Sequence, residues 1–324
     1  MKSIAFFNNK GGVGKTTLLC NVAAYAALKL KKRVCVIDAD PQCNATQYFF
    51  DEKVIDFIYD IGGFTVSNVV EPLMDGEGYV RDPQILKCSS FGLDVLPGDP
   101  NLAIMEDFLA REWASAKGGD IRAIKTNLVF SDLLDKLQIY DYVFLDVSPS
   151  LGAINRSILL SSDYFVSPMS IDIFSLRAFG NIQKWIDEWK RDWDISIKNV
   201  QQKSKVPTLK YGPAEFIGYV TQQYLAKRDA NGESRGVKAY EEIRKMIDSV
   251  ILECGLGQSI IDQKYEIGTV PNLFSLAPMS QSNNKPIFDL KANDGVVGAH
   301  FAKVKDAEEI FKNVTLQLFE RIDD

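Results

Sequence analysis

The residues with the clearest chemical potential lie close to the first residue of the chain. They form the run Asn9, Lys10, Gly11, Gly12, Val13, Gly14, Lys15, Thr16 and Thr17. Glycines allow successive backbone N–H groups to curl around an anion, and a helix that follows adds the positive end of its dipole. The run therefore predicts a nucleotide phosphate site, with Lys15 on the β and γ phosphates and the Thr16 hydroxyl on Mg²⁺. A glycine turn without a ligand is the alternative.

Three aspartates follow apolar runs that read as strands. Asp38 and Asp40 end the second such run, and Asp146 ends a later run, 142–145. Carboxylates at the carboxyl ends of parallel strands face the crevice that holds the phosphate loop. Asp146 is expected to hold Mg²⁺ through water, whereas Asp38 and Asp40 either reach the nucleotide or only cap a turn.

Polar and small residues directly after Asp146 form a candidate switch. Ser148 and Pro149 begin the segment 148–152, which is placed to sense the γ phosphate. Phosphoryl transfer to water needs cations around the phosphate oxygens and an oriented water, but little covalent chemistry from the protein. The predicted activity is therefore Mg²⁺-dependent hydrolysis of a nucleoside triphosphate to the diphosphate and phosphate.

The elements that must position these residues can be read from hydrophobic periodicity. Apolar runs predict strands at 4–7, 34–37, 93–96, 142–145, 164–167, 216–220 and 266–270. Helical spacing predicts helices at 18–30, 102–113, 121–137, 174–193, 237–254 and 302–322. Continuous hydrophobicity in the strands indicates burial on both faces. We therefore expect an α/β fold, with a mostly parallel twisted sheet and helices on both faces.

The same pattern continues along the whole chain, which predicts a single P-loop ATPase domain over residues 1–324. Two segments stand apart from it. Residues 51–100 are expected to hold additional structure where a partner could dock, and residues 198–213 read as an exposed connector rather than a domain linker.

The phosphate-binding run departs from the usual P-loop pattern, because Asn9 stands where glycine is expected and Lys10 is added. In this respect the chain resembles the deviant Walker A ATPases that include ParA, Soj and MinD, and is most similar to the ParA and Soj type. The resemblance implies that the nucleotide is ATP, which is hydrolysed to ADP and phosphate. It further implies that Lys10 crosses a dimer interface to the phosphates of the partner subunit, so that the ATP-bound form is a homodimer.

The resemblance also implies roles for residues around the two aspartates and in the second half of the chain. Asp38 would support the metal shell and Asp40 would orient or activate water, which with Lys10 and Lys15 makes the catalytic set. Pro41 and Gln42 would belong to the first switch. Three further residues would contact the adenine base or, alternatively, only turn the chain: Gln222, Pro271 and Asn272.

Composition limits the partners of the protein. The chain has 324 residues, 46% of them hydrophobic, and a net charge of −6, so any DNA contact requires a local basic patch. Five cysteines without a C-x-x-C pair argue against disulfides and zinc knuckles, which favours the cytoplasm. No apolar run is long enough to span a bilayer, the acidic last residues do not favour anionic lipids, and we interpret His300 as structural.

The resemblance to compact ParA and Soj proteins implies ATP-driven dimerisation, binding to DNA without sequence preference, and recycling by a ParB-like activator. The protein would then partition DNA or position a cargo, in the cytoplasm or on the nucleoid. Cations that could contact DNA phosphates are Lys184, Lys190, Arg191, Lys203, Lys205, Arg228, Arg235 and Lys238. These residues could equally be solvated surface charges, and Lys203 and Lys205 could bind a protein. The alternative function is a nucleotide-gated scaffold that recruits a protein as an ATP-bound dimer without DNA.

Overall fold

The computed structural model describes residues 1–224, 226–228, 234–236, 238–257, 260 and 264–323. The side chains of residues 173 and 223–241 lie outside this description.

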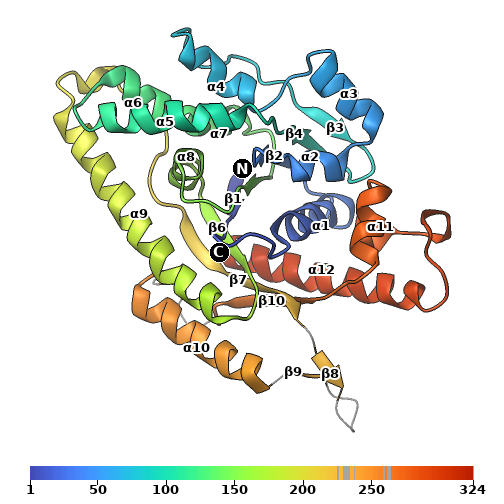
Figure 1. Cartoon of the computed structure of the whole chain (residues 1–324). Coiled ribbons are helices and arrows are strands. Elements are labelled where there is room, and N and C mark those ends of the chain that lie inside the picture. The colour runs from blue at the N-terminus through green and yellow to red at the C-terminus, as the bar shows by residue number, and fades with distance from the viewer. Residues whose placement is uncertain (225, 229–233, 237, 258–259, 261–263, 324) are drawn as a thin grey trace.

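An eight-stranded sheet runs through the middle of the molecule (Figure 1). Its spatial order is β10 (Glu266–Pro271), β7 (Glu215–Tyr224), β6 (Tyr164–Met169), β1 (Lys2–Phe6), β5 (Tyr142–Val147), β2 (Val34–Ala39), β4 (Leu93–Leu96) and β3 (Leu86–Cys88). All neighbours are parallel except β3, which pairs antiparallel with β4 at the edge. In the sheet β5 lies between β1, which leads into the phosphate loop, and β2. This position brings Asp146 to the same edge as the loop.

Helices cover both faces of the sheet. One face is covered by α4 (Ser67–Met74), α5 (Leu102–Ala116), α6 (Ile121–Asn127), α7 (Val129–Lys136), α8 (Ala153–Ser161), α9 (Ile173–Asn199) and α10 (Lys238–Cys254). The other is covered by α1 (Lys15–Leu28), α2 (Asn44–Phe49), α3 (Glu52–Asp60), α11 (Leu276–Ser282) and α12 (His300–Asp323). Alternate residues of β1 serve the two cores, Ala5 on the first face and Ile4 and Phe6 on the second. This arrangement confirms the predicted α/β class and its covered parallel sheet.

The short elements complete the chain. A separate two-stranded pair consists of β8 (Ala226–Arg228) and β9 (Ser234–Gly236). Three 3-10 turns lie at η1 (Lys203–Lys205), η2 (Ile287–Asp289) and η3 (Ala292–Asp294). The segment that we expected to carry additional structure holds α3, α4 and the edge strand β3.

Two helix boundaries differ from the sequence prediction. The helix expected over 121–137 is interrupted at Leu128, whose ψ of 7° leaves the helical region. There the Asn127 side chain donates to the Ala123 carbonyl at 2.8 Å and competes with the backbone. The helix expected over 174–193 continues to Asn199, so the predicted connector begins inside α9 rather than at its end.

The last helix closes one face by packing onto the central strands. The Phe319 ring stacks on the Tyr142 ring of β5 with centroids 4.1 Å apart, and both side chains are buried. The Tyr142 hydroxyl donates to Asp323 at 2.8 Å, and Lys2 pairs with the same carboxylate at 3.0 Å. These contacts place the two ends of the chain side by side (Figure 1).

Truncation of this stacked ring should destabilise the protein. We expect Phe319→Ala to lower the free energy of unfolding by about 3 to 5 kcal/mol, because a buried aromatic side chain is replaced by a cavity. Urea denaturation followed by circular dichroism measures the change. The control is Leu316→Ala on the same helix, where the side chain is 42% exposed and the loss should be small. Equal losses for the two variants would contradict the packing described here.

Candidate active site

The phosphate loop is anchored at its start and opens into α1. The Asn8 amide donates to the Pro168 carbonyl at the end of β6 at 2.6 Å, and its oxygen accepts from the Lys10 N–H at 3.0 Å. Gly12 and Gly14 have φ values of +74° and +80°, which favour glycine. Gly14 is the N-cap of α1 and has no side chain to cover the first N–H groups of the helix. The start of α1 is therefore suited to bind an anion.

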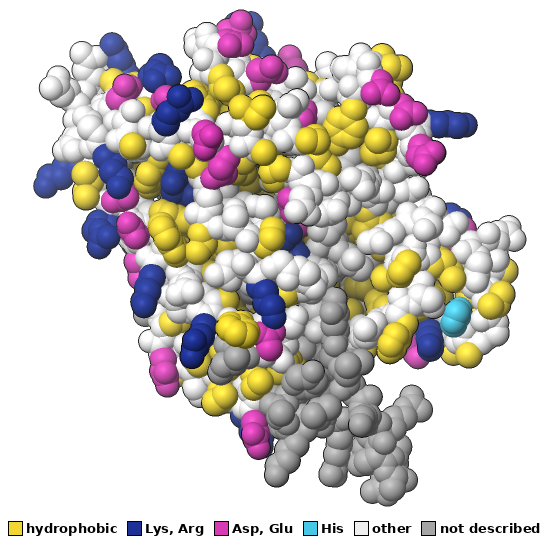
Figure 2. All heavy atoms as spheres, in the orientation of Figure 1, with side chains coloured by type: hydrophobic (Ala, Val, Ile, Leu, Met, Phe, Trp, Pro, Cys, Tyr) yellow, Lys and Arg dark blue, Asp and Glu magenta, His cyan; other side chains and the backbone are white. Residues whose placement is uncertain are grey.

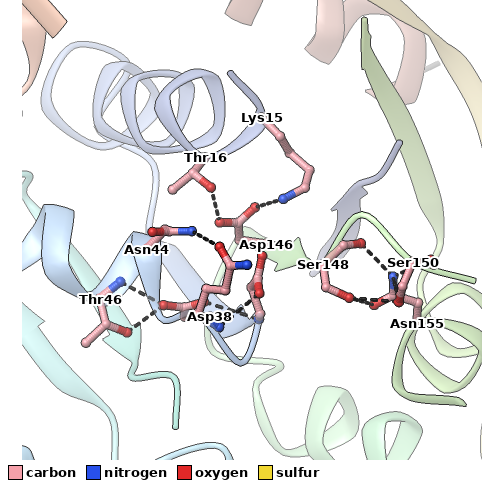
Figure 3. Close-up of polar contacts among 11 residues, drawn as sticks. Lys15, Thr16, Asp38, Asn44, Thr46, Asp146, Ser148, Ser150 and Asn155 are labelled. Atoms are coloured by element: carbon pink, nitrogen blue, oxygen red, sulfur yellow. Dashed lines mark hydrogen bonds and ion pairs between the residues drawn. The ribbon is translucent and has the colours of Figure 1, made fainter. Parts of the chain in front are cut away.

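Asp146 is the acceptor at the centre of the site. It is fully buried at the end of β5, where its Oδ1 accepts from Lys15 Nζ at 3.1 Å and its Oδ2 from Thr16 Oγ1 at 2.7 Å. Figure 3 shows Lys15 and Thr16 reaching Asp146 from the same helix. The three residues predicted to meet at the phosphate end of a nucleotide are therefore in direct contact.

Asp38 lies directly beside Asp146, because the two residues are register partners on β2 and β5. Its Oδ2 accepts from the Thr46 N–H at 2.7 Å and from the Thr46 hydroxyl at 2.6 Å (Figure 3). Thr46 in turn accepts from the Gly98 N–H at 2.7 Å. A Cβ on Gly98 would lie 2.9 Å from the Asp38 carboxyl carbon, so this glycine permits a close approach. Asp38 therefore holds the first turn of α2 in place beside Asp146. Its predicted contact with the nucleotide or the metal shell stays a prediction.

The two neighbouring carboxylates perturb each other. Burial and the charge of Asp146 raise the pKa of Asp38 to about 7, against the opposing hydrogen bonds from Thr46. Burial also raises the pKa of Asp146, although Lys15 and Thr16 oppose this shift. The interior of the site is therefore short of positive charge.

The buried carboxylates suit a magnesium ion that keeps water and phosphate ligands better than a metal ion that only protein side chains coordinate. Asp38, Asp40 and Asp146 are all buried, and Lys15 pairs with Asp146. In the part of the chain that the structure describes, no group of three His, Cys, Asp or Glu side chains forms a closed metal site. Mg²⁺ typically takes one or two protein ligands and completes its shell with water and phosphate oxygens. The residues present are consistent with that mode.

A pocket of about 630 Å³ opens above these groups. It is lined by the whole loop from Lys10 to Thr17, by Asp40, Gln42, Asn44, Gln47 and Tyr48, and by Pro149, Gln281 and Ser282. Asp40 Oδ1 accepts from the Gln42 N–H at 3.0 Å, which fixes the turn that carries both residues. The pocket thus brings together the predicted loop and one residue of each predicted switch, Gln42 and Pro149.

The far wall of this pocket includes Gln281 and Ser282 at the end of α11, which the sequence analysis did not assign to the site. Tyr48 on α2 and Ser280 on α11 share a hydrogen bond of 2.6 Å between their hydroxyls. The Asn284 amide donates to the carbonyls of Gln47 and Phe50 at 3.0 and 2.9 Å. Gln222, Pro271 and Asn272 do not line the pocket, and Asn272 accepts from the Phe274 N–H at 2.8 Å within a turn. Their assignment as adenine contacts stays a prediction.

The second switch is held by residues outside its own segment. The Asn155 amide donates to the carbonyls of Ser148 and Ser150, each at 2.7 Å (Figure 3). Glu106 on α5 caps the start of α8 by accepting from the N–H groups of Ala153 and Ile154, the second at 3.0 Å. Neither residue belongs to a recognisable motif, so a single sequence offers no signal for them.

Lys10 points to a different carboxylate from Lys15. Its ammonium group pairs with Asp172, which also caps α9 by accepting from the N–H groups of Phe174 and Ser175, both at 3.0 Å. Burial acts against ionisation of Asp172, but the bonds from Lys10 and Ser175 hold its pKa below the usual value. The Lys10 side chain remains 36% exposed, at the rim of the pocket and away from Asp146.

Comparison with known proteins identifies the family of the chain. A family model described as an AAA domain matches residues 1–201. The sporulation initiation inhibitor protein Soj of Bacillus subtilis is 32% identical over 56% of this chain and 63% of its own length. The chain belongs to the ParA/Soj family of P-loop ATPases.

Two solved structures share the fold of this chain. A protein of Corynebacterium diphtheriae is 32% identical with a TM-score of 0.70, covering 88% of this chain and 97% of that one. A plasmid partition protein of Borrelia burgdorferi, bound to AMPPNP, is 20% identical with a TM-score of 0.61, and 98% of each chain is covered. The second likeness concerns the fold alone.

The cations predicted to contact DNA are distributed unevenly over the structure of this ParA/Soj family member. Lys184, Lys190 and Arg191 are exposed on α9, and Lys203 and Lys205 are exposed on η1. Figure 2 shows Lys and Arg along α9 interspersed with Asp and Glu. The side chains of Arg228, Arg235 and Lys238 lie outside the described residues. Within the described residues, no helix combines the length and hydrophobicity needed to cross a bilayer.

The raised pKa of Asp38 makes a prediction about stability. An unfolded aspartate titrates near 3.8 and Asp38 near 7, so the folded state binds an extra proton between these values. The contribution of Asp38 to stability therefore falls as the pH rises from about 4 to about 7. Relative to the unmodified protein, Asp38→Asn should gain on the order of 2 kcal/mol of unfolding free energy between pH 5 and pH 8. Urea denaturation at pH 5 and pH 8, without nucleotide, measures this difference in unfolding free energy.

The matched control is Asp306→Asn, which removes an exposed carboxylate on α12. This variant should follow the pH profile of the unmodified protein. If Asp38→Asn does so as well, the carboxylates of β2 and β5 are not coupled as described.

Proposed function

We propose that this protein is a Mg²⁺-dependent ATPase that dimerises on binding ATP and uses this cycle to partition DNA or to position a cargo. The observation that carries the proposal is the contact of Lys15 and Thr16 with buried Asp146 below an open helix start. A nucleotide phosphate at the start of α1 lies within reach of the same lysine and hydroxyl.

The residues divide the work of hydrolysis between them. Thr16 and Asp146 would hold Mg²⁺, with Asp38 behind them in support. When bound, Mg²⁺ neutralises charge on the phosphate oxygens. Lys15 binds the β and γ phosphates, and Asp40, which lines the pocket, orients the attacking water. Ser148 and Pro149 would change position with the presence of the γ phosphate and so couple it to α8.

The position of Lys10 supports a role outside its own site. Its ammonium group is turned away from Asp146 and lies at the rim, where a second copy of the chain could receive it. In the ATP-bound homodimer, Lys10 would neutralise charge on the phosphates of the partner subunit, in the way that an arginine finger does. A ParB-like activator would stimulate turnover of this dimer.

DNA would bind along α9 without sequence preference. Exposed Lys184, Lys190 and Arg191 can displace counterions from phosphates, although neighbouring Asp187 and Asp194 weaken the local field. DNA binding that requires ATP would favour partition or positioning. Its absence would favour the alternative, a nucleotide-gated scaffold that recruits a protein.

Removal of the Lys10 ammonium group should separate binding from turnover. We expect Lys10→Ala to bind ATP with an affinity close to that of the unmodified protein, while the rate of phosphate release falls by about tenfold or more. Calorimetry measures binding and a phosphate assay measures turnover. As a control, Lys15→Ala should lose ATP binding itself. Unchanged turnover in Lys10→Ala would remove this residue from the mechanism.

Charge reversal on α9 tests the DNA role. We expect the double variant Lys190→Glu, Arg191→Glu to bind duplex DNA about tenfold or more weakly in the presence of ATP, with a shallower dependence on salt. The control reverses Lys303 and Lys305, two exposed cations on α12. Fluorescence anisotropy at several salt concentrations measures both. Equal losses in the two variants would contradict a DNA site on α9.

A further inference from the structure

Along one edge of its buried side, α3 carries hydrophobic residues that the described structure leaves largely uncovered. Phe57 is 48% exposed and Ile61 is 76% exposed, and the two lie one helical turn apart on the same stripe. The packed side of the helix, with Ile58 buried against the core, lies next to this stripe, so Phe57 and Ile61 extend the apolar face beyond the part that the core covers. A stripe of this kind on a soluble helix commonly marks a contact surface.

Carboxylates run beside this stripe. Asp56 and Asp60 are exposed on the same helix, again one turn apart, and no Lys or Arg within the described residues pairs with either. Residues 51–82 contain eight acidic and two basic residues, a net charge of −6 that equals the net charge of the whole chain. All other residues together are neutral. Figure 2 shows Asp and Glu gathered with hydrophobic side chains over α3 and α4.

We propose that Asp56, Phe57, Asp60 and Ile61, here called the α3 face, dock a basic amphipathic segment of a partner protein. Charge complementarity identifies this occupant. Nucleic acid would be repelled by the same carboxylates. A second copy of the chain, related by a two-fold axis, would bring each acidic stripe against its own counterpart. A segment that alternates lysine or arginine with large apolar side chains matches both stripes at once.

The α3 face is joined to the candidate active site by a short chain of hydrogen bonds. The Tyr59 hydroxyl donates to the Gly98 carbonyl at 3.0 Å, and the Gly98 N–H donates to Thr46 Oγ1 at 2.7 Å. Thr46 Oγ1 then donates to Asp38 at 2.6 Å. Because Gly98 lies so close to Asp38, a movement of Gly98 along this series of hydrogen bonds would also displace Asp38. Tyr59 is therefore a positioning residue through which docking reaches Asp38, and this second step rests on the proposed function.

A binding experiment without nucleotide tests the docking surface by itself. The probe is a short fluorescent peptide with lysine and leucine at helical spacing, titrated with the full chain and followed by anisotropy. We expect the double variant Asp56→Lys, Asp60→Lys and the single variant Ile61→Ser each to bind about tenfold more weakly. The matched controls are Asp306→Lys on α12 and Ile139→Ser, whose isoleucine is 67% exposed, and both should bind as the unmodified protein does.

Two results would overturn the docking surface. One is binding that is unchanged in the α3 variants, or weakened equally in the controls. The other is nucleotide-free self-association of the unmodified protein that Ile61→Ser abolishes in sedimentation velocity, because the occupant would then be a second copy. Thermal unfolding curves that match the unmodified protein establish that each variant is folded.

A turnover experiment tests the connection to the site. We expect Tyr59→Phe to keep its affinity for the peptide but to lose the change in ATP turnover that the peptide causes in the unmodified protein. An equal change in both proteins would overturn the role of Tyr59. If the unmodified protein binds the peptide but hydrolyses no ATP, the proposed function fails while the docking surface stands.

Discussion

The structure depends on one buried carboxylate. Asp146 ends the central strand β5 with no exposure to solvent, and a charge in that position is tolerated only with bonded partners. Lys15 and Thr16 supply them from the first turn of α1. The loop between β1 and α1 must therefore return over the end of β5, which fixes where a phosphate can bind. The position of β5, the start of α1 and the proposed phosphate chemistry all depend on this contact.

A second buried carboxylate, Asp38, lies beside Asp146 and leaves the interior of the site short of positive charge. Asp38 faces Asp146 across neighbouring strands, and burial together with the charge of Asp146 raises the pKa of Asp38 to about 7. Hydrogen bonds from Thr46 hold Asp38 in place without supplying a positive charge. In the proposed function, a cation that enters with the nucleotide would relieve this repulsion. Ligand binding and the stability of the fold would then be linked through the same pair of residues.

The sequence predicts those parts of the site that lie on one continuous motif or at the end of one strand. The loop from Lys10 to Thr17, Asp38 and Asp146 fall into this class because apolar strands place them at a common edge. Asn155 and Glu106 escape prediction because their partners are backbone groups, which leave no residue pattern. The break at Leu128 escapes because one side-chain bond from Asn127 decides it within an otherwise helical hydrophobic pattern.

The far wall of the pocket illustrates a different limit, since its parts lie far apart along the chain. Asn21 in α1 and Ile287 are hydrogen-bonded across a separation of 266 residues, and Gln281 and Ser282 face the loop from this late segment. During synthesis the glycine loop and α1 are made well before the opposite wall. A growing chain therefore carries the motif before it has the finished cavity, and the complete pocket forms only after this later segment has packed against α1.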